Sequence, residues 1–67
     1  MKTVIFIFKS GKVSKFNVAM DGNISELKEK IKESLKKEEI VELQGTKNNS
    51  VLIVNTKEIV AFQVEEE

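Results

Sequence analysis

Runs of apolar residues alternate with short polar stretches along the chain, and their spacing predicts several short strands. Residues 4–8 are apolar without interruption, whereas residues 13–20 alternate between apolar and polar side chains. A strand that is apolar on both faces is central in its sheet or pairs with another chain, and an alternating strand exposes one face. Gly11 lies between the two runs and supplies the positive φ of a hairpin turn. The first 20 residues therefore predict a β-hairpin.

Residues 24–37 carry the pattern of an amphipathic helix. Asn23 is the expected N-cap, and Glu26 stands at the third helical position of a capping box. The apolar stripe recurs at spacings of three and four residues and consists of Ile24, Leu27, Ile31 and Leu35. Two ion pairs between residues four apart are expected on the exposed side, Glu26–Lys30 and Glu33–Lys37. Because the stripe is narrow, we expect the helix to cover one face of a sheet.

Three further strands are predicted in the second half of the chain, over residues 40–44, 51–54 and 58–64. The first alternates, the second is apolar on both faces, and the third has its apolar side chains on one face. Those side chains are Val60, Phe62 and Val64. The order strand, strand, helix, strand, strand, strand is typical of an α+β domain. We expect one helix packed on a single, mainly antiparallel sheet, either β-grasp-like or a small, partly closed barrel.

One helix covers one face of one sheet, and several apolar residues exceed what that cover can bury. They are Ile5, Ile7, Ile40, Leu52, Val54 and Ile59. Two arrangements remain open. The sheet either curls on itself and buries both faces, or it leaves an apolar patch for a second chain.

Length and composition predict one domain over residues 1–67 with a small core, since a chain this short buries only about 60% of its unfolded surface. No Cys or His is present, so disulfides and a structural zinc site are not expected as additional supports. Self-association is another way to bury apolar surface. No apolar run approaches the length of a membrane span, and we expect a cytoplasmic protein without a membrane partner.

The chain also lacks Arg, Tyr and Trp, and catalysis near neutral pH draws mainly on His, Cys, Tyr and Arg. Carboxylates are the catalytic groups that remain. The cluster of Glu38, Glu39 and Glu42 is typical of a solvated surface. We therefore expect no enzymatic activity, no catalytic or metal-binding residue and no cofactor.

Charge is unevenly distributed, because residues 1–37 carry a net charge of +5 and residues 38–67 a net charge of −5. Folding either mixes these charges or leaves a dipolar surface. Six lysines could contact the phosphates of a nucleic acid: Lys9, Lys12 and Lys15 on the first hairpin and Lys28, Lys32 and Lys36 along the helix. The absence of Arg and the zero net charge oppose that interpretation, and Lys stems also cover apolar surface on a solvated helix face.

Residues 1–35 resemble the opening of the β-grasp fold, as in ubiquitin and its relatives. The resemblance lies in the run Met1–Phe6, the turn at Ser10–Lys12, the second strand at Phe16–Val18 and the helix from Ile24 to Ile31. It implies a hairpin followed by a helix packed on the sheet. The chain ends in three Glu instead of the two Gly that conjugated or sulfur-carrying relatives use, so those activities are not implied.

Residues 51–62 resemble the closing strands of small uncharacterised proteins from low-GC Gram-positive bacteria and their phages. That resemblance implies no activity, favours an accessory or regulatory role over a metabolic one, and implies a phage or mobile-element origin. Together these observations predict a small, non-enzymatic protein-interaction module that self-associates as a homodimer or larger oligomer. The alternative is a small nucleic-acid-binding regulatory protein that uses the six lysines named above.

Overall fold

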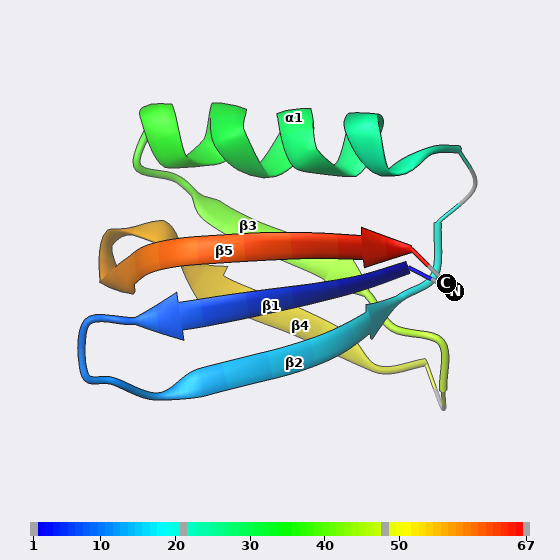
Figure 1. The fold of residues 1–67 in the computed structure, drawn as a ribbon, viewed down its shortest axis with the longest axis horizontal. Helices are drawn as coiled ribbons and strands as arrows, with labels where there is room; N and C mark the ends of the chain where they lie inside the picture. The colour runs from blue at the N-terminus through cyan, green and yellow to red at the C-terminus, as the bar shows by residue number, and fades with distance from the viewer. Residues whose placement is uncertain (1, 21, 48, 67) are drawn as a thin grey trace.

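Five strands and one α-helix follow one another in the order ββαβββ in a computed structural model of the protein, which describes residues 2–20, 22–47 and 49–66 (Figure 1). The α+β class and the order of elements predicted from the sequence are confirmed. The elements are β1 (Lys2–Phe8), β2 (Val13–Val18), α1 (Ile24–Lys36), β3 (Ile40–Gln44), β4 (Val51–Asn55), the 3₁₀ turn η1 (Thr56–Glu58) and β5 (Ile59–Glu66).

The strands divide between two antiparallel sheets instead of forming the single sheet that we expected. One sheet has the order β2-β1-β5, and the other consists of β3 and β4. Figure 1 shows β3 and β4 behind the three-stranded sheet, with α1 along the side where β5 and β3 lie. A single bridge between Val18 and Gly45 joins the two sheets at one corner, where the amide of Ala19 donates to the carbonyl of Gln44 at 2.9 Å.

The hydrophobic core lies between the two sheets and beneath the helix. Its fully buried side chains come from three elements: Val4 and Phe6 on β1, Leu27 and Ile31 on α1, and Val41 on β3. The small sheet thus covers an inner surface that the helix alone could not reach. Only some of the apolar residues that exceeded the expected cover of the helix are buried in this way. Val54 and Ile59 are buried and Leu52 is half-buried, whereas Ile7 and Ile40 remain exposed.

The last strand departs from the predicted alternation at its start. Ile7 lies opposite Ala61, whereas the next residue of β1 lies opposite Ile59, so Val60 is the extra residue of a β-bulge. The bulge turns Ile59 into the core and leaves Val60 65% exposed. The prediction that Val60 shares a buried face with Phe62 and Val64 is therefore wrong.

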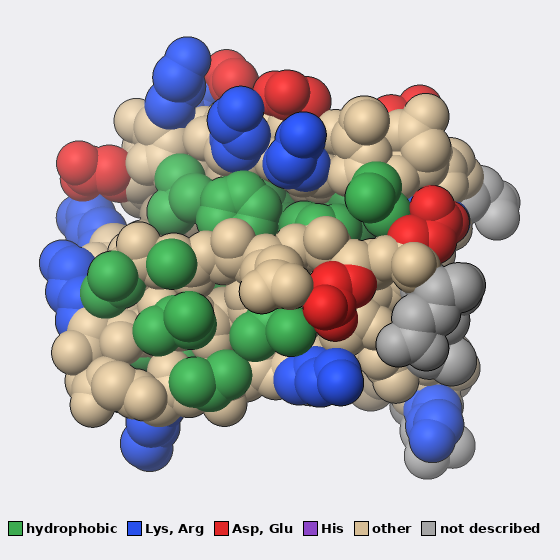
Figure 2. All heavy atoms as spheres, in the orientation of Figure 1, with side chains coloured by type: hydrophobic (Ala, Val, Ile, Leu, Met, Phe, Trp, Pro, Cys, Tyr) green, Lys and Arg blue, Asp and Glu red, His purple; other side chains and the backbone are tan. Residues whose placement is uncertain are grey.

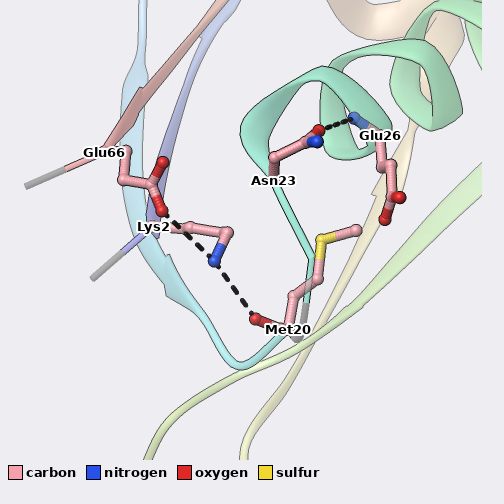
Figure 3. A network of polar contacts seen from close by, with 5 residues as sticks. All are labelled: Lys2, Met20, Asn23, Glu26 and Glu66. Atoms are coloured by element: carbon pink, nitrogen blue, oxygen red, sulfur yellow. Dashed lines mark hydrogen bonds and ion pairs between the residues drawn. The ribbon is translucent and has the colours of Figure 1, made fainter.

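The helix begins and ends close to the predicted bounds. The Asn23 carboxamide oxygen accepts a hydrogen bond from the amide of Glu26 at 3.1 Å, which confirms the N-cap (Figure 3). Glu33 and Lys37 form the predicted ion pair at 3.9 Å, and a second pair joins Glu29 to Lys32 at 3.9 Å. The expected pair between Glu26 and Lys30 is not formed among the described residues.

Lys2 ties together the end of the molecule at which β1 begins and β5 ends. Its ammonium lies 3.3 Å from the Glu66 carboxylate and donates to the carbonyl of Met20 at 3.4 Å (Figure 3). The Lys2 side chain is mostly buried, whereas that of Glu66 is 45% exposed. The first strand, the last strand and the segment that leads into α1 are therefore held at one corner.

Candidate interaction surfaces

Chemical groups for catalysis or metal binding are sparse on this fold. Across residues 2–20, 22–47 and 49–66, no group of three or more His, Cys, Asp or Glu side chains could hold a metal ion. Glu38, Glu39 and Glu42 are all exposed, as a solvated cluster would be. None of the helices described is both long enough and apolar enough to cross a bilayer. The candidate sites described below are surfaces and grooves.

The first candidate is the outward side of the three-stranded sheet, which we call the Ile7 face. Because Val4 and Phe6 point into the core, Ile5 and Ile7 must point outward. Ile7 lies directly opposite Val13 on β2 and Ala61 on β5, so three apolar side chains form one row across the sheet. Figure 2 shows hydrophobic side chains gathered on this side of the molecule. The apolar part of the Ile7 face is Ile5, Ile7, Val13 and Ala61.

Polar side chains border the Ile7 face in an ordered way. Lys15 and Gln63 lie on either side of Ile5, and Asn17 and Glu65 lie on either side of Thr3. Thr3 donates a hydrogen bond to Asn17 at 3.0 Å, and Gln63 donates to Glu65 at 3.0 Å. The face therefore has an apolar end next to the turn between β1 and β2, and a hydrogen-bonded polar end at Thr3. A cation lies on the β2 side and an anion on the β5 side.

The second candidate is the outward side of the two-stranded sheet, which we call the Ile53 face. It carries Ile40, Val51 and Ile53 together with Glu42, Gln44 and Asn55. Each apolar residue lies directly opposite a polar one: Ile40 opposite Asn55, Ile53 opposite Glu42, and Val51 opposite Gln44. The apolar side chains are thus interrupted by polar ones, and no apolar row crosses these two strands.

The third candidate is a groove of about 400 Å³ between α1 and β5. Ile24, Phe62 and Val64 provide its apolar lining, and Lys28 and Lys32 extend from the helix beside it. Figure 2 shows a band of hydrophobic side chains between the helix and the sheet, with basic side chains above it. Among the described residues, no backbone hydrogen bond links β5 to α1. The edge of β5 that faces away from β1 therefore borders the groove.

A shallower cleft of about 340 Å³ separates the first hairpin from β4. Phe8 and Ser14 line one side, and Leu52 and Val54 line the other. No ladder joins β2 to β4 within the described parts of the chain. The cleft thus lies along a gap between the two sheets, and β5 and β3 are likewise not joined by a ladder among the described residues.

The structure distributes the six lysines considered for nucleic-acid binding among separate places. Lys28 and Lys32 border the groove beside α1, and Lys36 continues their line along the helix. Lys9 lies near Lys57, beyond the C-terminal end of the helix. Lys15 lies within the β1–β2 ladder, opposite Ile5, and is close to Lys47, whereas Lys12 is in the turn between β1 and β2. No continuous basic stripe joins these positions.

Sequence patterns identified some members of these surfaces and missed others. The continuous apolar run at residues 4–8 indicated an outward apolar pair on β1. Val13 and Ala61 could not be assigned to the same row, because their places depend on the strand register and on the bulge at Val60. The groove beside α1 was missed for a similar reason, since nothing local in the sequence tells which strand lies beside the helix.

Comparisons of the chain with protein-family models, with curated proteins and with solved structures found no match. The resemblances of residues 1–35 and 51–62 described above stay predictions.

Proposed function

We propose that the protein is a non-enzymatic interaction module that self-associates through the Ile7 face. The observation that carries this proposal is the apolar row of Val13, Ile7 and Ala61, which continues into Ile5. A contiguous exposed apolar patch on a small domain is typical of an interaction site, whereas scattered apolar residues are common on any surface. Burial of this row between two copies would supply apolar contact that a 67-residue core lacks.

The arrangement of charges favours a second copy as the partner. A two-fold axis parallel to β1 places the β2 side of one copy over the β5 side of the other. Ile7 then meets Ile7, and Val13 meets Ala61. In this arrangement Lys15 of one copy lies opposite Gln63 of the other copy, and Glu65 of that copy is two residues further along β5. The Lys15 ammonium of each copy therefore faces the acidic side of the other. Apolar groups and opposite charges thus coincide in a single symmetric arrangement.

Light scattering coupled to size exclusion, over a range of loading concentrations, tests the proposal. We expect the wild type to change from monomer to dimer with rising concentration. Ile7→Lys places an ammonium in the centre of the row and should weaken association about tenfold or more. Ile53→Lys is the matched control, since it adds the same charge to an exposed strand position on the other sheet.

A wild type that stays monomeric at millimolar concentration would refute self-association. Equal weakening by Ile7→Lys and Ile53→Lys would show that net charge, and not this face, governs assembly. Circular dichroism of both variants checks that the fold is kept.

Nucleic-acid binding is the weaker candidate. Its six lysines lie at separate places, and the groove beside α1 holds two of them next to an apolar lining. Titration of single-stranded and duplex oligonucleotides at low salt tests it, because the phosphate term is strongest there.

A further inference from the structure

We infer that Ala61 determines how the Ile7 face recognises a second copy: its short side chain leaves room over β5, and the Val13 side chain of the other copy fills that room. This size match fixes the relative orientation of the two copies. The inference rests on the proposed function, since it concerns the same face.

The first observation is the unequal size of the side chains in the apolar row. Ile7 on β1 lies between Val13 on β2 and Ala61 on β5, the two strands that flank β1 (Figure 1). Val13 is 63% exposed, whereas the exposed Ala61 carries only a methyl group. The row therefore projects further over β2 than over β5. Close packing at an interface requires each projection to meet a recess, and this row carries one of each.

The second observation is that the β-bulge brings Ala61 into the row. Phe8 lies opposite Ile59, so a regular ladder would continue with Val60 opposite Ile7. Val60 is instead the extra residue, and Ala61 takes the position opposite Ile7. Bulges commonly redirect a side chain of the bulged strand. Here the bulge places a methyl group where the regular ladder would place a valine side chain.

Two symmetric orientations bring the faces together, because the two-fold axis runs either parallel to β1 or across the strands. With the axis parallel to β1, each Val13 meets the Ala61 of the other copy. With the axis across the strands at Ile7, Val13 meets Val13 and Ala61 meets Ala61. Two valines would then hold the sheets apart while the two alanines face a gap, and overpacking and gaps are both unfavourable. Side-chain size therefore selects the axis parallel to β1.

Charge favours the same orientation. With the axis across the strands, Lys15, two residues beyond Val13 on β2, comes over the turn of the other copy, which contains Lys12. With the axis parallel to β1, Lys15 faces the acidic side of the other copy, and no like charges are brought together in this way.

The twist of the sheets leaves the match intact. Packed sheets cross at about 30°, and Val13 and Ala61 lie one strand, or about 5 Å, from the axis. The crossing therefore displaces them along the strands by about 2.5 Å, which is less than the rise of about 3.3 Å for one residue.

The test exchanges the two side chains in one chain. Val13→Ala/Ala61→Val has the composition and net charge of the wild type. Between two copies of this variant each valine again meets an alanine, so self-association should stay within about threefold of the wild type. Between the variant and the wild type, valine meets valine on one side and alanine meets alanine on the other. The mixed dimer should therefore be about tenfold weaker or more.

Amide resonances of the ¹⁵N-labelled wild type measure this difference. One titration adds the unlabelled exchange variant, and a parallel titration adds unlabelled wild type. We expect the wild type to shift the resonances of β1 at lower concentration than the exchange variant does. The labelled exchange variant, titrated with its own unlabelled copy, should behave as the wild type does with itself.

Single variants separate the two halves of the contact. Ala61→Val crowds both contacts and Val13→Ala leaves both empty, so each should weaken self-association by about fivefold or more. Val51→Ala is the matched control for Val13→Ala, because it removes the same groups from an exposed position on the Ile53 face. It should leave self-association unchanged. Circular dichroism of every variant checks that the fold is kept.

Mixed dimers as stable as the wild-type dimer would overturn the inference, because the sizes of the two side chains would then not govern recognition. Mixed dimers more stable than the wild-type dimer would also overturn it, since they indicate an axis across the strands. Weakening of the exchange variant to the level of Ala61→Val would do the same. In these cases the proposed function stands if Ile7→Lys still weakens association, whereas a wild type that stays monomeric refutes both.

Discussion

The two outward sheet faces differ in the arrangement of their apolar residues more than in how exposed these residues are. On the Ile53 face, Ile53 is 63% exposed and Ile40 is 65% exposed, whereas Ile7 on the other face is only 40% exposed. Yet Ile7 has apolar neighbours on both adjacent strands, and Ile53 has Glu42 directly opposite. The two faces therefore differ in the contiguity of their apolar residues across strands, and on our proposal this contiguity, rather than the exposure of single residues, makes the Ile7 face an interaction surface.

The largest expected effect comes from removing the core on which both faces depend. Leu27→Ala should lower the free energy of unfolding by about 2–5 kcal/mol, because the side chain is 1% exposed in the core beneath the helix. For a domain of this size, that is a large part of the total stability. Urea unfolding followed by circular dichroism measures it. A loss well below 1 kcal/mol would mean that α1 does not pack on the core as described.

A second prediction concerns a variant in which the apolar side chains of the Ile53 face become contiguous, as those of the Ile7 face are. Glu42→Val removes the carboxylate opposite Ile53 and joins Ile40, residue 42 and Ile53 into one apolar surface. In the Ile7→Lys background, where association is weakened, this change should restore concentration-dependent association by about tenfold. Sedimentation equilibrium of Ile7→Lys with and without Glu42→Val measures the difference. If the two proteins sediment identically, the contiguity of apolar side chains does not determine self-association.

The smallest expected effect concerns the charges beside the Ile7 face. Lys15→Glu should weaken self-association by about 0.5–1 kcal/mol, as is usual for exposed charge pairs, and the difference should shrink in high salt. The exchange Lys15→Glu/Glu65→Lys restores opposite charges across the two-fold axis and should recover most of the loss. Failure of the exchange to recover affinity would contradict the symmetric arrangement, while leaving the apolar row as the interface.

Much of the fold was predictable because its signals are local. The N-cap at Asn23, the buried pair Leu27 and Ile31, and the inward Val41 and Leu43 all follow from spacing within one element. The split into two sheets was not, because it depends on contacts between segments that are distant along the chain. The bulge at Val60 likewise arises where β1 and β5 meet, and alternation within β5 carries no sign of it.

For the candidate sites too, local sequence signals predicted part of the surface, and contacts between distant segments determined the rest. The continuous apolar run of β1 predicted an outward apolar surface, and that surface is present at Ile7, which is exposed, and at Ile5, which is half-buried. Its neighbours Val13 and Ala61 required the register of both adjacent strands. The six lysines formed a plausible set only while their places in space were unknown. In the fold, Lys28 and Lys32 border the groove beside β5, Lys9 lies near the C-terminal end of the helix, and Lys15 lies near Lys47.

Self-association through the Ile7 face is tested most directly by the amide resonances of the wild type over a dilution series. We expect concentration-dependent shifts in β1, at Val13 and Lys15 of β2 and at Ala61 and Gln63 of β5, while the resonances of β3 and β4 stay constant. Spectra that do not change from micromolar to millimolar concentration, or shifts confined to β3 and β4, would contradict it.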